Sequence, residues 1–180
     1  FDAEKVYSES LKWAEKYDAE LAEMLKADKE YALKIFGIER RNKKPRKDIA
    51  KWSDVKNEIS YMYDEKFYVQ NVNYEYQKIS DSDKIKIILD EYINNYFDEN
   101  DDKQEWFNKI KALAGKLGYA SEVKEFKVNP DKYEAHVGDV STVLRIALTG
   151  RSNTPDMYEI MEIMGKDRIQ ERFEHAKKEL

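Results

Sequence analysis

Apolar residues recur every three to four positions along most of the chain, which is the spacing of an amphipathic α-helix. In residues 2–26 the recurring positions are Leu11, Ala14, Ala19, Leu21, Met24 and Leu25. Asp28 is a candidate N-cap for a second helix that stops near Gly37, and Ser53 is a candidate N-cap for a third. The helices predicted for the first hundred residues therefore cover 2–26, 28–36, 51–67 and, after a cap among Ser80, Asp81 and Ser82, the stretch to Phe97.

The last third of the chain predicts short helices joined by tight corners. One helix carries Trp106, Ile110, Leu113, Ala114 and Leu117 and ends at Gly118. Asp139 is the candidate cap of the next, whose apolar positions are Val140, Val143, Leu144, Ala147 and Leu148, and Gly150 ends it. Thr154 and Pro155 mark a further start, because proline suits a first helical turn. The stripe Met157, Ile160, Met161 and Met164 follows, then a stop at Gly165 and a final helix that buries Ile169, Phe173 and Ala176.

The pattern predicts an all-α protein with two packed helical domains. An acidic run at 98–102 interrupts the helices where a boundary would fall, so we expect domains at 1–100 and 101–180. Residues 68–79 are the least helical, and we interpret them as a loop, with a short pair of strands as the alternative. Six glycines and three prolines supply too few turns for a β-sandwich or barrel.

Composition narrows the chemistry. The 180 residues include no cysteine and two histidines, His136 and His175, so thiolate catalysis and a histidine-rich metal centre are not expected. No apolar run is long enough to span a membrane. The chain begins at Phe1 and has no signal-peptide pattern, so we expect a cytoplasmic piece of a longer protein. We also expect a monomer. The net charge is −5, so any anionic partner must be held by a local patch.

One such patch lies in the first half of the chain. Six of the eight residues from 40 to 47 are basic: Arg40, Arg41, Lys43, Lys44, Arg46 and Lys47. The run is either a solvated loop or a site for phosphates, and six contacts to single-stranded backbone would give a log–log salt slope of about −4. The neighbouring rings of Trp52, Tyr61 and Tyr63 are interpreted as core rather than as stacking platforms.

A second candidate site combines Arg145 with the corner after its helix. The corner contains Thr149, Gly150, Arg151, Thr154 and Pro155. An arginine on a rigid helix beside small polar residues can read base edges of unpaired RNA. The alternative is an edge arginine paired with an acidic residue.

Motifs of catalysis are missing from the sequence. It contains no phosphate-cradling glycine loop, no G-x-S-x-G and no HExxH, and neither histidine has an evident catalytic partner. The sequence therefore favours a binding function over a catalytic one. Besides RNA recognition, an adaptor for another protein is considered, with Met157, Met161 and Met164 as an exposed adaptable face. A stand-alone RNA-binding module is the third possibility.

Two segments carry a resemblance to a known family. They are residues 106–119, WFNKIKALAGKLGY, and residues 136–173, HVGDVSTVLRIALTGRSNTPDMYEIMEIMGKDRIQERF. With their ordered elements GDV, LRIALTGR, TPD-Y-I and GK-R---R, they resemble the C-terminal anticodon-binding region of bacterial glutamyl-tRNA synthetases. Upstream, WAEKYDAELAEML, IERRNKKPRKDIAKWSDV and ISYMYDE are similar to the preceding helical domain in one branch of that family. The match covers nearly the whole chain and is weakest from 67 to 102.

The resemblance implies an α-helical cage that binds the anticodon stem-loop of tRNA(Glu) and catalyses nothing. A class I catalytic domain, using ATP and Mg²⁺ to attach glutamate, would precede Phe1, so this piece would hold no cofactor and no metal. Carried over by position, the residues facing anticodon bases are Arg145, Thr154, Pro155 and Met157. Arg46 is the expected counterpart of an upstream arginine that reads the last anticodon base, with Arg40 and Arg41 as alternatives. Arg151 and the basic run are expected at phosphates. Whether tRNA(Gln) is also accepted stays open.

Overall fold

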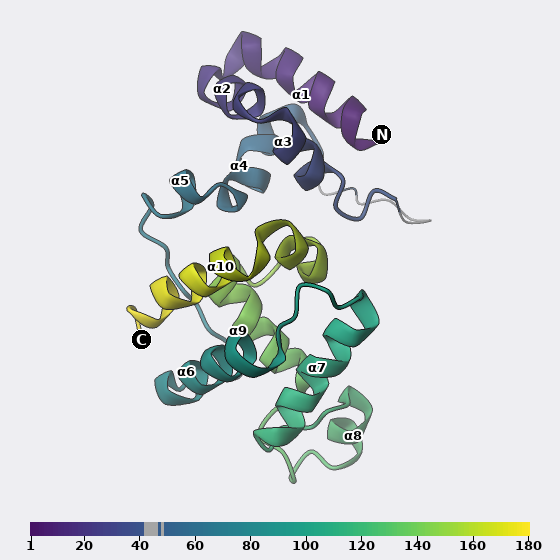
Figure 1. Ribbon diagram of the computed structural model, residues 1–180, viewed down its shortest axis with the longest axis vertical. Helices are drawn as coiled ribbons and strands as arrows, with labels where there is room; N and C mark the ends of the chain where they lie inside the picture. The colour runs from purple at the N-terminus through teal and green to yellow at the C-terminus, as the bar shows by residue number, and fades with distance from the viewer. Residues whose placement is uncertain (42–46, 48) are drawn as a thin grey trace. The chain divides into compact units, whose positions relative to one another are not determined.

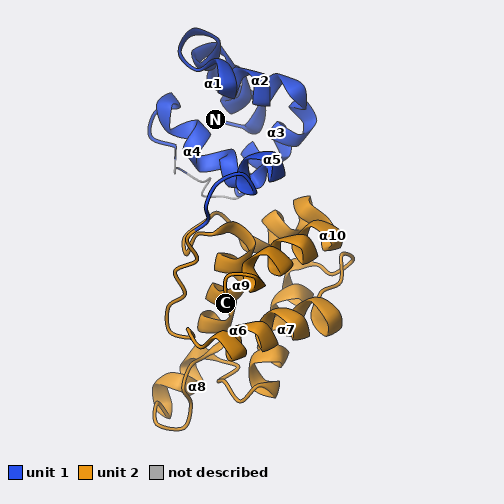
Figure 2. Cartoon of the chain, turned by 90° about the vertical axis from the view of Figure 1, so that its left-hand side faces the viewer, with its two compact units in different colours: residues 1–72 blue, residues 73–180 orange. Residues whose placement is uncertain are grey.

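The computed structural model describes residues 1–41, 47 and 49–180, and in this part of the chain every regular element is a helix (Figure 1). The chain divides into two compact units, residues 1–72 (unit 1) and 73–180 (unit 2), which Figure 2 colours blue and orange. The predicted all-α class is confirmed. Among the described helices none is both long and apolar enough to cross a bilayer.

Unit 1 begins with three helices, α1 (Ala3–Tyr17), α2 (Ala19–Ala27) and α3 (Lys29–Phe36). An aspartate side chain caps each of them, since Asp2, Asp18 and Asp28 accept hydrogen bonds from backbone N–H groups three residues on, at 2.8, 3.1 and 3.0 Å. The single helix predicted over 2–26 is therefore wrong. Asp18 closes α1 by donating its N–H to the Ala14 carbonyl and opens α2 with its carboxylate.

The remainder of unit 1 is a series of short turns. These are η1 (Trp52–Asp54), α4 (Val55–Ile59), η2 (Ser60–Met62) and α5 (Asp64–Phe67), where one continuous helix was predicted. Ser53 makes no cap, and the extended backbone of Tyr63 breaks the helix before α5. The turns still bury one face, so the predicted apolar positions Val55, Ile59 and Met62 lie in the core with Leu21, Leu25, Phe36 and Phe67.

Unit 2 is built around α9 (Val137–Thr149), which packs against α6 (Ser82–Glu91), α7 (Lys103–Lys116) and α10 (Met157–Lys177) (Figure 1). A π-helical turn, η3 (Tyr92–Tyr96), continues α6, and the short α8 (Val123–Val128) lies in the connection to α9. The predicted helix ends at Gly150 and Gly165 are confirmed. Gly150 adopts a left-handed conformation (φ 73°), and Gly165 (φ 76°, ψ 167°) divides α10 into two helical halves.

Two features differ from the sequence-based expectation, namely the cap of α9 and the position at which the chain divides into units. The cap of α9 is His136, whose Nδ1 accepts the Gly138 N–H at 2.9 Å, while Asp139 bonds back to the His136 N–H at 3.0 Å. The compact units divide near residue 72, where a boundary near 100 was expected. The physical reason is that α6 buries Ile85, Ile88 and Leu89 and packs on α9. Residues 68–79, all of them described, form a loop without a strand.

Candidate nucleic-acid interface

The corner between α9 and α10 brings together most of the residues singled out in the second half of the sequence. The Thr149 hydroxyl is buried, donates to the Arg145 carbonyl at 2.8 Å and accepts the Arg151 N–H at 3.1 Å. The left-handed Gly150 then reverses the chain, and its N–H donates to the Ile146 carbonyl at 2.7 Å. The direction of the backbone at Arg151 is thus set by one buried hydroxyl and one glycine.

The corner ends at a capped helix start. The Asp156 carboxylate accepts the Glu159 N–H at 3.2 Å and pairs with Lys103 of α7 at 2.9 Å. Helix α10 therefore starts at Met157, and Pro155 lies ahead of the cap rather than in the first turn as predicted. The Thr154 hydroxyl donates to the Pro155 carbonyl at 2.8 Å, which closes a small polar loop before the cap.

Buried contacts support the corner from beneath. Arg172, in the second half of α10, is 0% exposed and its Nη1 donates to the Leu148 carbonyl at 3.1 Å. The Met161 sulfur accepts hydrogen bonds from Trp106 Nε1 at 3.2 Å and from the Tyr92 hydroxyl at 3.4 Å. Burial raises the pKa of that Tyr92 hydroxyl, so it stays a neutral donor. The corner thus rests on a closely packed interior, which suits a surface that must present groups in one geometry.

The predicted base-reading residues differ in their exposure to solvent. Arg145, Arg151, Thr154 and Pro155 are half-buried and retain surface along α9 and the corner. Met157 is 2% exposed, so its side chain packs beneath the corner. The corner therefore offers guanidinium groups, hydroxyls and backbone polar groups, which are the groups that read unpaired bases.

The buried methionines also decide against the exposed adaptor face. Met157, Met161 and Met164 are 2%, 1% and 5% exposed, respectively. They belong to the core of unit 2, and the sequence-based idea of a methionine-rich docking surface is wrong.

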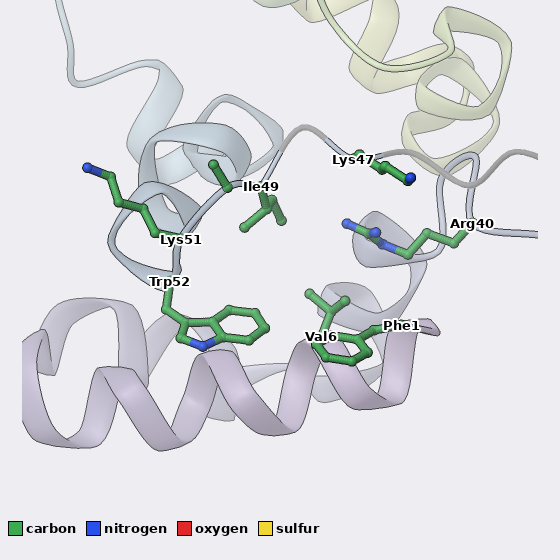
Figure 3. A pocket seen from close by; sticks show the side chains of 8 residues that line it. Phe1, Val6, Arg40, Lys47, Ile49, Lys51 and Trp52 are labelled. Carbon is green, nitrogen blue, oxygen red and sulfur yellow. The ribbon is translucent and has the colours of Figure 1, made fainter.

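A cavity of about 430 Å³ lies in unit 1, and Arg40 and Lys47 of the basic run are among the residues that line it (Figure 3). Its aromatic lining is the indole of Trp52 and the ring of Phe1, whose planes lie within 9° of parallel with centroids 6.4 Å apart. On another side of the cavity the side chains of Arg40 and Lys47 run in opposite directions, one above the other in the view. Lys51 also lines the cavity, but its ammonium group points away from it. We name this cavity the ring–cation pocket.

The basic run is described only in part. Arg41 and Lys47 are exposed and Arg40 is half-buried, whereas Lys43, Lys44 and Arg46 lie outside the described residues. Tyr61 and Tyr63 are buried as predicted. Trp52 keeps exposed surface and lines the ring–cation pocket, which the expectation of a core residue missed. The available signal in the sequence was a tryptophan that follows the basic run by five positions.

Both histidines have structural contacts. His136 caps α9, and its ring contacts Phe126 edge to face. His175 Nδ1 lies 2.8 Å from the Tyr74 hydroxyl. Tyr74 stacks on Tyr76, whose buried position raises its pKa to about 12. In the described ranges, no group of three or more histidine, aspartate or glutamate side chains is placed to hold a metal ion.

These features define a class of protein. Residues 19–177 match the family model described as an anticodon binding domain, and the chain belongs to this family. In particular it is similar to glutamate–tRNA ligases. It is 42% identical over 172 residues to the glutamate–tRNA ligase of Acetivibrio thermocellus, covering 96% of this chain and 31% of that protein.

Two other relatives give the same picture. The glutamate–tRNA ligase of Clostridium perfringens strain SM101 is 40% identical over 171 residues, covering 94% of this chain and 31% of the relative. The glutamate–tRNA ligase of Sorangium cellulosum is 37% identical over 172 residues, covering 95% of this chain and 30% of the relative. The chain thus spans about a third of the length of the curated relatives it matches.

Proposed function

We propose that this chain recognises the anticodon stem-loop of tRNA(Glu) as part of a glutamate–tRNA ligase. The observation that carries the proposal is the polar corner between α9 and α10, supported by membership of the anticodon binding domain family. Arg145, Thr154 and Pro155 would contact anticodon bases, with Met157 holding the corner from below. Unit 2 would be the C-terminal anticodon-binding part and unit 1 the upstream one.

Phosphate contacts complete the proposal. Arg151 would neutralise backbone charge together with five residues of the basic run, namely Arg40, Arg41, Lys43, Lys44 and Lys47. Arg46 is the proposed reader of the last anticodon base. Selective holding rather than chemistry is then the task of this chain, and ATP, Mg²⁺ and glutamate would act in a part of the ligase that the chain does not include. We further propose that the chain is monomeric and works in the cytoplasm.

Arg145 provides the test of base reading. Arg145→Ala should weaken binding of a tRNA(Glu) anticodon stem-loop by roughly tenfold or more, since a good bidentate contact discriminates bases by about 1–3 kcal/mol. A stem-loop with altered anticodon bases should lose much less. Arg145→Lys keeps the charge but not the planar fork, so it should keep part of the affinity and lose the discrimination.

Fluorescence anisotropy with both stem-loops measures the two affinities at one salt concentration. Lys124→Ala on α8 is the control, because it removes a positive charge outside the corner. Equal losses of affinity for both stem-loops would show that Arg145 contributes charge alone, and base reading by this residue would be rejected.

A further inference from the structure

A cavity in unit 2 combines aromatic rings with carboxylates. Its volume is about 140 Å³, and its lining comes from the loop that precedes α7, from α7 itself and from the first half of α10. The apolar part of the lining is formed by Phe97, Trp106, Tyr158 and Met161, and the acidic part by Asp98, Glu99, Asp101 and Glu162. Among the described residues that line the cavity, none is basic. We name it the acidic–aromatic cavity.

The rings of the cavity are held in place by contacts between helices. Trp106 and Tyr158 meet edge to face, with their centroids 5.7 Å apart and their planes at 61°. Trp106 Nε1 donates to the Met161 sulfur at 3.2 Å, which fixes the indole of α7 against α10. The face of an aromatic ring carries partial negative charge and attracts cations. The apolar part of the lining therefore suits a positively charged ligand, as the acidic part does.

The carboxylates of the cavity are mostly without a cationic partner. Asp101 pairs with Lys109 at 2.5 Å. Asp98, Glu99 and Glu162 form no ion pair with any described residue; they accept hydrogen bonds from two backbone N–H groups and one hydroxyl. These neutral donors leave the negative charge of the three carboxylates uncompensated, so the cavity keeps an excess of negative charge.

The pKa values of two neighbouring groups reflect this negative charge. The carboxylate of Asp101, which bonds to Lys109, and the charge of Asp98 raise the pKa of the Lys109 ammonium group. Burial and the carboxylate of Glu162 raise the pKa of the Tyr158 hydroxyl. Both shifts favour the protonated form, as expected where positive charge is stabilised.

The arrangement of the lining narrows the kind of cation. Within the described ranges, no group of three or more acidic side chains is placed to hold a metal ion. A volume of about 140 Å³ is below the roughly 300 Å³ of a typical small-molecule site, so the cavity admits one end of a ligand. Asp98 and Asp101 are half-buried, whereas Glu99 and Glu162 are exposed. Carboxylates at two depths suit a ligand with two positive charges joined by an apolar chain.

We propose that the acidic–aromatic cavity binds an aliphatic diamine, with one ammonium group inserted against the rings and the other beside Glu99 and Glu162. The inference does not rest on the proposed function, because no residue proposed to contact RNA lines the cavity. A bound diamine would connect the loop before α7 to the first half of α10.

Indole resonances give a direct test on the unmodified chain. Labelling with ¹⁵N gives one Nε1–H resonance each for Trp13, Trp52 and Trp106, of which Trp106 lines the cavity. Trp13→Phe and Trp52→Phe assign the three signals. Titration with diaminobutane should shift the Trp106 resonance until it saturates and leave the other two in place. Sodium chloride at the same ionic strength, and butanediol, which has the same chain without charge, should not shift it.

Two substitutions of Tyr158 isolate the contribution of its ring. Tyr158→Phe and Tyr158→Leu both remove the hydroxyl that donates to the Asp101 carbonyl, so the difference between them reports the aromatic face. Tyr158→Leu should bind diaminobutane roughly threefold more weakly than Tyr158→Phe does, which is the size of an exposed cation–π contact. Equal affinities would show that the ring does not contact the ligand.

The exposed carboxylates have their own matched pair. Glu162→Gln should weaken binding of diaminobutane roughly threefold, as expected for one exposed charge contact. Glu171→Gln is the control, because Glu171 is also exposed on α10 but does not line the cavity. Butylamine carries one ammonium group, so it should bind more weakly than diaminobutane, and Glu162→Gln should change its affinity less.

Three outcomes would overturn the proposal. Diaminobutane could leave the Trp106 resonance in place, or sodium chloride could shift it equally. Equal losses for Glu162→Gln and Glu171→Gln would mean general attraction to an acidic chain. Butylamine binding as tightly as diaminobutane would reject a ligand with two charges. Each of these results leaves the Arg145 test of anticodon recognition unaffected, since that test uses RNA and residues outside the cavity.

Discussion

Arg172 shows how a single side chain can determine the shape of the corner. Among the described residues it is the charged side chain without solvent exposure, and its guanidinium donates to the Leu148 carbonyl in the last turn of α9. The last carbonyls of a helix lack partners within the helix, so a buried helix end needs a donor from elsewhere. Arg172 supplies it from the second half of α10 and thereby connects α10 to the chain just before the Gly150 reversal.

We therefore expect Arg172→Ala to lower the free energy of unfolding of unit 2 by about 3 kcal/mol, because it leaves the Leu148 carbonyl unpaired and opens a cavity in the core. Arg172→Met keeps most of the volume and removes the charge, so it should cost less, about 1–3 kcal/mol for the unpaired carbonyl. Urea unfolding measures both. Lys178→Ala, at the exposed end of the same helix, is the control and should change stability by less than about 0.5 kcal/mol.

His136 explains why one residue-level prediction failed. Ser, Thr, Asp and Asn are the usual N-caps, so the sequence favoured Asp139 as the cap of α9. In the structure His136 takes the cap position and Asp139 takes the third helical position, bonding back to the His136 N–H at 3.0 Å. The reciprocal pattern is that of a capping box with an imidazole in place of a hydroxyl. The acidic residue three positions after the cap was the recognisable part of the signal.

At the scale of elements, glycines predicted correctly where helices end. Apolar spacing did not predict correctly which stretches form one continuous helix. Gly150 and Gly165 were predicted as helix ends because backbone with positive φ suits glycine. Asp18 was missed because the apolar spacing on either side of it continues nearly in phase. The stretch 51–67 has helical spacing as well, but its short turns bury the same face without forming one helix. Periodicity identified which residues are buried, and capping decided where the helices divide.

Gly165 tests this element-scale argument. Its backbone (φ 76°, ψ 167°) lies in a region that residues with a Cβ rarely adopt, and an added Cβ would lie 3.4 Å from Glu99 Oε1. That same oxygen accepts the Lys166 N–H at 2.6 Å, so it caps the second half of α10. Gly165→Ala should cost about 1–3 kcal/mol of stability, measured by urea unfolding.

Gln170→Ala is the appropriate control for Gly165→Ala. Gln170 is exposed in the same helix and has ordinary helical backbone, so alanine should be nearly neutral there. If Gly165→Ala were as stable as this control, α10 would tolerate a continuous helix and the divided form would not be a requirement of the fold.

At the scale of the whole molecule, the sequence predicted the fold class and most of the core but placed the division of the chain differently. The acidic run at 98–102 looks like a linker because acidic residues are usually solvated. In the structure the acidic run contacts neighbouring helices. The Tyr158 hydroxyl of α10 donates to the Asp101 carbonyl at 2.8 Å, and the Asp102 side chain caps α7. Long-range contacts of this kind leave no local pattern. The ring–cation pocket was missed for a similar reason, because Arg40 and Trp52 lie 12 positions apart and meet only in the folded unit.

Truncation distinguishes the two divisions directly. A fragment of residues 73–180 keeps the whole of unit 2 and should be helical with a cooperative unfolding transition. A fragment of residues 101–180 loses α6 and η3, and with them Ile85, Ile88, Leu89 and Tyr92, all 0% exposed in the core against which α9 packs. Removing large buried side chains costs about 2–5 kcal/mol each, more in sum than a domain of this size can lose. Circular dichroism during urea titration should therefore show a sharp transition for the longer fragment and none for the shorter, and a cooperative transition in the shorter one would restore the boundary near residue 100.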